Sequence, residues 1–170
     1  AGPGTIQRLA IAAFLSRIKT DVLGVPYKGS PQALTDLIGG QVQFMFDAVL
    51  SGRPHVESGR LKALAVASLG PIPQMPGVPA AAQSSLPELK DFEIEGWVGL
   101  LGPKDMPPGV TQRLNRAITD ILTSPEMQDR LAKANIAVAP VNTPQQFAQF
   151  LRTDAKRWKD IVEAAHIPQE

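Results

Sequence analysis

The chain has 170 residues, of which 44% are hydrophobic, and its 17 basic and 16 acidic residues leave a formal charge of +1. This near balance provides no broad positive field, so nucleic acid is not expected as a partner. The absence of cysteine excludes disulfides, thiolate catalysis and cysteine metal sites. No apolar run approaches the roughly 20 residues that span a bilayer, and we expect a soluble chain whose export signal is not part of this segment.

Amphipathic segments and short apolar segments alternate through the first part of the chain. Apolar residues at helical spacing predict helices, and Pro31 and Gly39-Gly40 mark the start and stop of one of them. The expected helices span residues 5–18, 30–38 and 49–58, the last broken around Pro54. Short apolar strands are expected at 22–25, 42–46 and 61–67. This β-α-β-α-β order predicts a parallel sheet with right-handed crossovers.

The second part of the chain is predicted to be mainly helical. Five prolines between Leu69 and Pro87 indicate a surface connection, with a helical turn at 80–83, and residues 92–101 are expected to form a long crossing strand. Three helices are expected here. The first follows Pro107-Pro108, and the second begins at Ser124-Pro125 and runs to 134. The third begins at the capping box Thr143-Pro144-Gln145-Gln146 and runs to about 165.

These later helices have few strands of their own to cover. A helix buries its apolar stripe against another element. Either the C-terminal helices pack back on the first sheet, or they belong to a second lobe whose strands come mainly from sequence outside this chain.

Two polar loops are candidates for a ligand site. Gly2-Pro3-Gly4-Thr5 precedes a helix, where free amides and the positive end of the helix dipole favour an anion. The alternative is an ordinary glycine turn capped by Thr5. Tyr27, Lys28, Gly29 and Ser30 form a strand-to-helix loop whose phenol, amides and hydroxyl can converge on a polar group, or they form a helix entry capped by Ser30.

Asp47, at the end of an expected strand, either accepts hydrogen bonds from a ligand or fixes the following loop. Its isolation argues against a carboxylate pair for acid–base chemistry. His55 and His166 lie outside any metal-ligand spacing, so neither a metal nor a cofactor is expected. Trp97 and Trp158 are expected to pack in the core. The charged residues of the last helix are expected to form its solvated face: Arg152, Asp154, Lys156, Arg157, Lys159 and Asp160.

Six motifs together carry a resemblance to a known family: Ala1-Gly-Pro-Gly-Thr5, Val25-Pro-Tyr-Lys-Gly-Ser30, Leu37-Ile-Gly-Gly-Gln-Val42, Phe46-Asp47, Gly59-Arg-Leu-Lys-Ala-Leu-Ala-Val66 and Trp97-Val-Gly-Leu-Leu101. In order and spacing, over essentially the whole chain, they resemble the tripartite tricarboxylate transporter receptors, also called Bug or TctC-like proteins. The resemblance implies an α/β fold with the two-lobe architecture of type II periplasmic binding proteins, in which the lobes close over a small organic carboxylate.

The resemblance also implies a division of the chain. Residues 1–92 resemble most of the second lobe, 93–102 the crossing between lobes, and 103–170 the helices that complete the first lobe. The family's ligand-binding positions fall on seven residues of this sequence: Gly2, Gly4, Thr5, Tyr27, Gly29, Ser30 and Asp47. The implied partners are a carboxylate ligand and membrane transporter subunits, and the implied location is the periplasm.

The sequence therefore favours a binding receptor without catalysis, and two alternatives stay open. One is a small α/β enzyme acting on a carboxylate, with Tyr27, Lys28 and Asp47 as acid–base groups. The other is a truncated interaction module, forming a homodimer through apolar surface that a missing lobe would cover.

Overall fold

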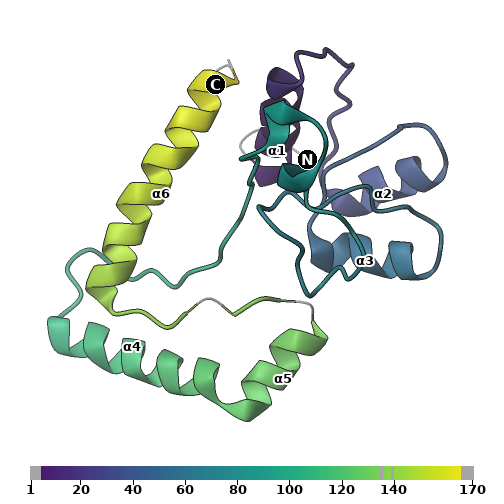
Figure 1. Cartoon of the computed structure of the whole chain (residues 1–170). Coiled ribbons are helices and arrows are strands. Elements are labelled where there is room, and N and C mark those ends of the chain that lie inside the picture. Colours follow the sequence, from purple (N-terminus) through teal and green to yellow (C-terminus); the bar gives the residue numbers. More distant parts are fainter. Residues whose placement is uncertain (1–4, 135, 139, 166–170) are drawn as a thin grey trace. The chain divides into compact units, whose positions relative to one another are not determined.

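The computed structural model describes residues 5–134, 136–138 and 140–165, and within these ranges the regular elements are helices (Figure 1). The α-helices are α1 (Ile6–Arg17), α2 (Ser30–Ile38), α3 (Val49–Glu57), α4 (Pro108–Thr123), α5 (Pro125–Lys133) and α6 (Pro144–Ala164). Two short 3₁₀ turns, η1 (Ala81–Gln83) and η2 (Pro87–Leu89), lie between α3 and α4.

The helix predictions are confirmed with one exception. The capping box at the start of α6 is formed, since the Thr143 amide donates to Gln146 Oε1 at 2.8 Å and the Gln146 amide donates to Thr143 Oγ1 at 3.2 Å. The expected break around Pro54 is wrong, because α3 runs through it. A proline removes only one amide hydrogen bond, and the Ser58 amide still donates to the Pro54 carbonyl at 3.1 Å.

None of the four predicted strands is formed among the described residues. Residues 22–25, 44–46, 62–65 and the expected crossing strand at 92–101 run without a regular sheet ladder, and the pairing present is an isolated parallel bridge between Val66 and Ala80. Leu23 is 93% exposed and Leu64 is 67% exposed. Since a parallel strand is built from regular bonds to neighbouring strands, an apolar run without such neighbours stays outside a sheet.

Three successive helices end in the same hydrogen-bonded turn. After α2 the Gly40 amide donates to Leu37 and the Gln41 amide donates to Asp36, and after α3 the Gly59 amide donates to Val56 and the Arg60 amide donates to His55. This Schellman pattern needs a residue at positive φ. Gly40 and Gly59 supply it at 73° and 71°, but after α1 the position is taken by Lys19, at 51°.

The chain divides into two compact units, residues 1–96 with 160–170 and residues 97–159. In the first unit, the rings of Phe14, Phe46 and Phe92 meet edge to face, with centroids 5.6 to 6.2 Å apart. Phe92 is 1% exposed, and Ala13 and Leu89 are buried with it. Edge-to-face pairs add to the burial of apolar area, so these rings join α1 to two segments that lack regular structure.

In the second unit, α4 and α5 meet at a sharp bend (Figure 1), and α6 carries a buried carboxylate. Asp154 is 7% exposed, which corrects its placement on the solvated face. Its Oδ2 accepts from the indoles of Trp97 at 2.7 Å and Trp158 at 3.1 Å, and its Oδ1 accepts from Arg157 Nε at 3.0 Å. Three donors make burial of this charge tolerable.

The expectation that Trp97 packs in the core is confirmed only in part, since Trp97 packs on Phe147 yet is 40% exposed.

None of the helices in the described ranges has the length and apolar character required to cross a membrane.

Replacing Lys19 by glycine is expected to stabilise the first unit by about 0.5–1 kcal/mol. A side chain at positive φ costs about 1–2 kcal/mol, and glycine's greater freedom in the unfolded chain offsets part of the gain. Urea unfolding of the two proteins measures the difference. Gly59→Ala is the matched opposite, since it introduces a Cβ at a φ of 71°, and it is expected to destabilise. A Lys19→Gly protein that unfolds at lower urea would contradict the strain argument.

Candidate functional site

The loop candidates Ser30 and Asp47 are joined by a direct hydrogen bond. Ser30, the first residue of α2, donates from Oγ to Asp47 Oδ1 at 2.6 Å, and Ser51, in the first turn of α3, donates from Oγ to Asp47 Oδ2 at 2.7 Å. We call Ser30, Asp47 and Ser51 the Asp47 cluster. Both carboxylate oxygens are engaged, and the three side chains are only partly buried. The cluster therefore fixes the starts of α2 and α3 to the end of the segment between them.

Ser30 does not cap α2, which corrects one of the two readings of this loop. The N-cap is Gly29, which has no side chain with which to cap the helix, and Ser30 is the first helical residue. With its hydroxyl donated to Asp47, Ser30 retains lone pairs that can accept. Pro31 has no amide hydrogen, so the amides of Ser30 and Gln32 are the donors that the first turn of α2 can offer.

Tyr27 is held by a residue that the sequence did not single out. Its hydroxyl donates to Asp36 Oδ2 at 2.8 Å. This hydrogen bond raises the pKa of the Tyr27 phenol above its ordinary value, with smaller contributions from desolvation and from the negative charge of Asp36. The bond ties the loop before α2 to the last turn of that helix. The phenol thus stays neutral and its oxygen can accept a further hydrogen bond.

Thr5 occupies the N-cap of α1, where its Oγ1 accepts from the Arg8 amide at 3.4 Å. The structure therefore places it at the start of the helix, as either reading of that turn requires. Gly2 and Gly4, the other candidates of this turn, lie outside the described residues.

The groups suggested for acid–base chemistry are not assembled into one constellation. Tyr27 is bonded to Asp36, Asp47 accepts from the two serines, and Lys28 is exposed. Within the described part of the chain, no hydrogen bond links Tyr27, Lys28 and Asp47 with one another. Hydroxyl donors that converge on a carboxylate order a loop, and they leave that carboxylate without a proton-transfer partner.

Sequence reasoning missed Asp36, Ser51 and Arg60, the last of which lines a pocket beside the cluster. Ser51 had a usable signal, since it follows Asp47 by four residues at the start of a predicted helix. Asp36 had none, because its partner lies nine residues earlier in an irregular segment.

Comparison with known proteins identifies the family of this chain. The family model for the tripartite tricarboxylate transporter family receptor matches residues 1–167. The chain belongs to this receptor family. A UPF0065 protein from the clcB-clcD intergenic region of Pseudomonas knackmussii is 36% identical over 162 residues, which cover 95% of this chain and 94% of that protein. A second, from the tcbD-tcbE intergenic region of Pseudomonas sp. strain P51, is 35% identical, and the match covers 95% of this chain and 47% of that protein.

Solved structures of receptors of this kind share the fold. The periplasmic binding protein BugD is 27% identical with a TM-score of 0.85, and the match covers 100% of this chain and 56% of BugD. MatC from Rhodopseudomonas palustris, solved with bound malate, is 30% identical with a TM-score of 0.77, and the match covers 95% of this chain and 55% of MatC. The fold is thus that of the periplasmic solute-binding proteins, as the resemblance implied. The chain spans about half the length of both these structures and of the strain P51 relative.

Removing the Asp47 carboxylate is expected to destabilise the protein. Asp47→Ala leaves the hydroxyls of Ser30 and Ser51 without their acceptor and deletes two charge-assisted bonds, at a cost of about 1–3 kcal/mol. Chemical denaturation measures the change. Asp21→Ala is the matched control, because Asp21 is exposed in a loop, and it is expected to change stability by less than about 0.5 kcal/mol. Equal stabilities for the two variants would show that the cluster contributes no net stability.

Tyr27 is the sole tyrosine of the chain, so its ionisation can be followed by the absorbance of tyrosinate. Because the folded pKa is raised, the stabilisation from the bond to Asp36 is fully present below the unfolded pKa of about 10 and is lost as the pH rises through the folded pKa. Asp36→Asn removes the negative acceptor and is expected to move the titration midpoint down towards the unfolded value. An unchanged midpoint would mean that Asp36 does not hold the phenol in solution.

Proposed function

We propose that this chain is the larger, C-terminal part of the ligand-binding body of a periplasmic receptor that captures a small organic carboxylate for a membrane transporter. Membership of the receptor family carries the proposal, and MatC, bound to malate, shows the ligand class of one relative. The mechanism is binding and lobe closure, without bond chemistry. Neither the Asp47 cluster nor the Tyr27 loop favours an enzyme.

The residues proposed to hold the ligand lie at two helix starts. Amides at the starts of α1 and α2, together with the positive ends of these helices, favour a carboxylate. Thr5 and the Gly29-Ser30 turn provide these positions, and Gly2 and Gly4 are proposed to complete the first. Each group is a neutral donor or dipole, so the site would select a charged oxygen without a salt bridge.

The hydrogen-bond directions refine the roles of the side chains. Ser30 and Tyr27 have both donated their protons to carboxylates of the protein, to Asp47 and Asp36 respectively. They can therefore accept from a ligand hydroxyl but do not offer a proton to its carboxylate. A second negative charge facing Asp47 would be repelled. We therefore assign Asp47 to ordering of the loops and to accepting from ligand hydroxyls, while backbone amides bind the carboxylate.

We further propose the division that the family implies, with 1–92 in the second lobe, 93–102 as the crossing and 103–170 completing the first lobe. Ligand held between two lobes shifts the equilibrium towards a closed form, because it contacts both walls only there. Closure would exclude water and strengthen the amide contacts. The closed form would then be the one presented to the transporter subunits.

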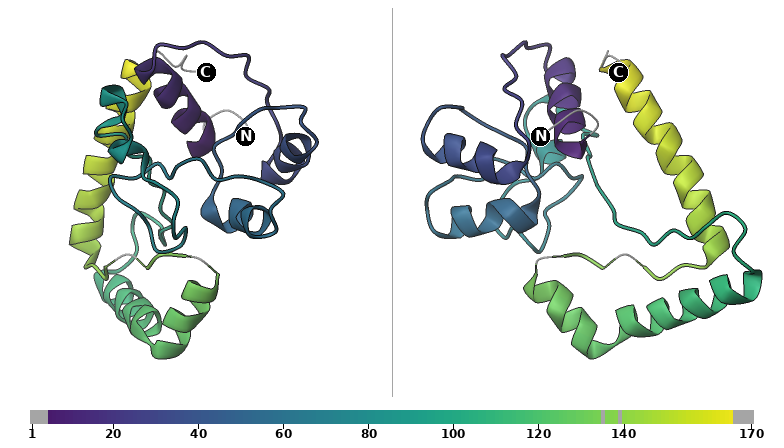
Figure 2. Two further views of the ribbon diagram at one scale, coloured as in Figure 1. Left: turned by 45° about the vertical axis from the view of Figure 1, so that its right-hand side comes forward. Right: turned by 180° about the vertical axis from the view of Figure 1, so that it is seen from behind.

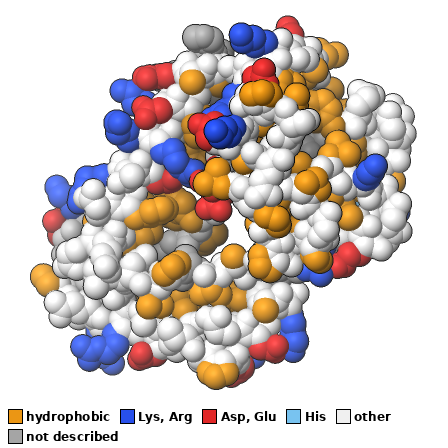
Figure 3. All heavy atoms as spheres, viewed as in Figure 1, with side chains coloured by type: hydrophobic (Ala, Val, Ile, Leu, Met, Phe, Trp, Pro, Cys, Tyr) orange, Lys and Arg blue, Asp and Glu red, His pale blue; other side chains and the backbone are white. Residues whose placement is uncertain are grey.

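Exposed apolar side chains favour one further function, that of an interaction module which pairs with a second copy. Hydrophobic side chains appear among polar ones on the face shown in Figure 3. Leu23 at 93%, Val98 at 102% and Leu101 at 69% are largely exposed. The Pseudomonas knackmussii relative, of which 94% is matched, has a length close to that of this chain. A contiguous apolar patch marks a contact site, and pairing of two copies would bury side chains that are exposed in this way.

Calorimetric titration with malate and a panel of other carboxylates tests the receptor. Binding is expected, and Ser30→Ala, which deletes the tie to Asp47 at the start of α2, is expected to weaken it about tenfold, the equivalent of roughly 1.4 kcal/mol. Ser84→Ala, an exposed serine in the loop before η2, is the matched control and is expected to bind normally.

Three results would separate the alternatives. Loss of affinity in the Ser84→Ala protein as well would point to misfolding rather than to the site. Chemical conversion of a bound carboxylate would establish an enzyme. Absence of carboxylate binding together with concentration-dependent dimerisation in sedimentation would replace the receptor with the interaction module.

A further inference from the structure

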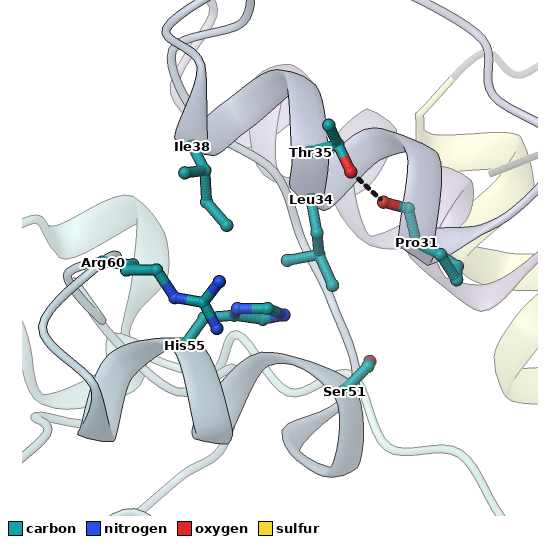
Figure 4. Close-up of a pocket in the computed structure, with 7 residues that line it drawn as sticks. All are labelled: Pro31, Leu34, Thr35, Ile38, Ser51, His55 and Arg60. Atoms are coloured by element: carbon teal, nitrogen blue, oxygen red, sulfur yellow. Dashed lines mark hydrogen bonds between the residues drawn. The ribbon is translucent and has the colours of Figure 1, made fainter.

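A pocket of about 510 Å³ opens between α2 and α3, and Ser51, which donates to Asp47, belongs to its lining (Figure 4). The two helices pack against each other and lie side by side in both views of Figure 2. The lining consists of Pro31, Leu34, Thr35, Ile38, Ser51, His55 and Arg60. No residue of the proposed ligand site lines this pocket, and Ser51 alone belongs to both the lining and the Asp47 cluster.

Helical spacing and one tight turn bring these side chains together. Leu34 and Ile38 lie four residues apart on α2, and Ser51 and His55 lie four apart on α3, so each pair occupies one helix face. Arg60 comes from the turn that ends α3, in which Gly59 at positive φ reverses the chain and the Arg60 amide donates to the His55 carbonyl at 2.9 Å. Figure 4 shows the Arg60 side chain directed back over the helix, beside the His55 ring.

The pocket combines an apolar wall with a single formal charge. Leu34 and Ile38 point into it from α2 (Figure 4), and no acidic residue belongs to the lining. The acidic groups of the adjoining helices have other partners, since Glu57 accepts from Arg53 at 2.6 Å and Asp36 accepts from Tyr27 at 2.8 Å. Arg60 uses its Nε on Ser58 Oγ, at 3.1 Å. That contact leaves the two terminal nitrogens of its guanidinium to face an incoming group.

The polar lining of the pocket is also incomplete. His55 Nδ1 is buried and has no hydrogen-bond partner within the described part of the chain. The hydroxyls nearby are already committed, because Thr35 donates to the Pro31 carbonyl at 3.0 Å and Ser51 donates to Asp47. A buried nitrogen without a partner costs free energy that a suitably placed group would recover. A ligand that fits this pocket therefore has polar atoms at one end, facing Arg60 and His55, and an apolar surface at the other, facing Leu34 and Ile38.

We propose that this pocket binds a small monocarboxylate with a compact apolar body. The carboxylate pairs with the Arg60 guanidinium, which matches the planar geometry of a carboxylate, and approaches the His55 ring. The apolar body lies against Leu34 and Ile38. A second carboxylate would find no cation here, so the site excludes dicarboxylates.

Benzoate and benzamide test the pocket on the protein without any substitution. The two probes have nearly the same shape, but only benzoate carries the charge. Imidazole signals in NMR provide the readout, because the chain has two histidines and His166→Gln assigns the signal of His55. Benzoate is expected to shift the His55 signal in a saturable manner, and benzamide is expected to bind at least tenfold more weakly. Equal affinity for both probes, or no saturable shift, would overturn the proposal.

Three variants locate the binding of benzoate. Arg60→Gln is expected to weaken it about tenfold, as loss of one charge-assisted contact implies. Lys62→Gln removes an exposed charge two residues away, outside the lining, and is expected to leave the affinity unchanged. Ser30→Ala removes a hydroxyl of the proposed ligand site that lies outside the pocket lining, and it is also expected to leave the affinity unchanged. Loss of affinity in the Ser30→Ala protein with retention in Arg60→Gln would place benzoate at the ligand site and overturn this inference, without bearing on the receptor function.

Discussion

The Asp47 carboxylate is the constraint on which the candidate site depends. Ser30 and Ser51 donate to its two oxygens from the starts of α2 and α3, so one side chain sets where both helices begin. The segments before these helices lack a sheet to hold them. In such a setting, two short bonds to one anion provide the order that a sheet would otherwise supply, and the amides at the start of α2 keep a fixed direction.

The helix ends matter as much as their starts. The same hydrogen-bonded turn ends α1, α2 and α3. After α3 this turn reverses the direction of the chain, so that the Arg60 side chain lies over the last turn of α3. A charged side chain thereby joins a pocket whose residues from α2 and α3 carry no formal charge. The pocket therefore owes its one charged side chain to a local rule of helix termination.

Local signals predicted the helices well. The bounds of α2 follow from Pro31 and from Gly39-Gly40, and the capping box of α6 follows from Thr143 and Gln146. Strands depend on neighbours that a local pattern does not contain, so the apolar runs at 22–25 and 61–67 were misread. Ser30 and Asp47 were recognised as candidates, but their direct bond and its second donor, Ser51, are tertiary facts. Asp154 looked solvated because its partner Trp97 lies 57 residues away in sequence.

The burial of Asp154 also determines what the intrinsic fluorescence of this protein can report. Both tryptophans of the chain, Trp97 and Trp158, donate to this one carboxylate. Their emission therefore senses the polarity around α6, whereas Tyr27, Ser30 and Asp47 belong to the other unit. A change in emission on addition of a solute would therefore report an event that reaches Asp154.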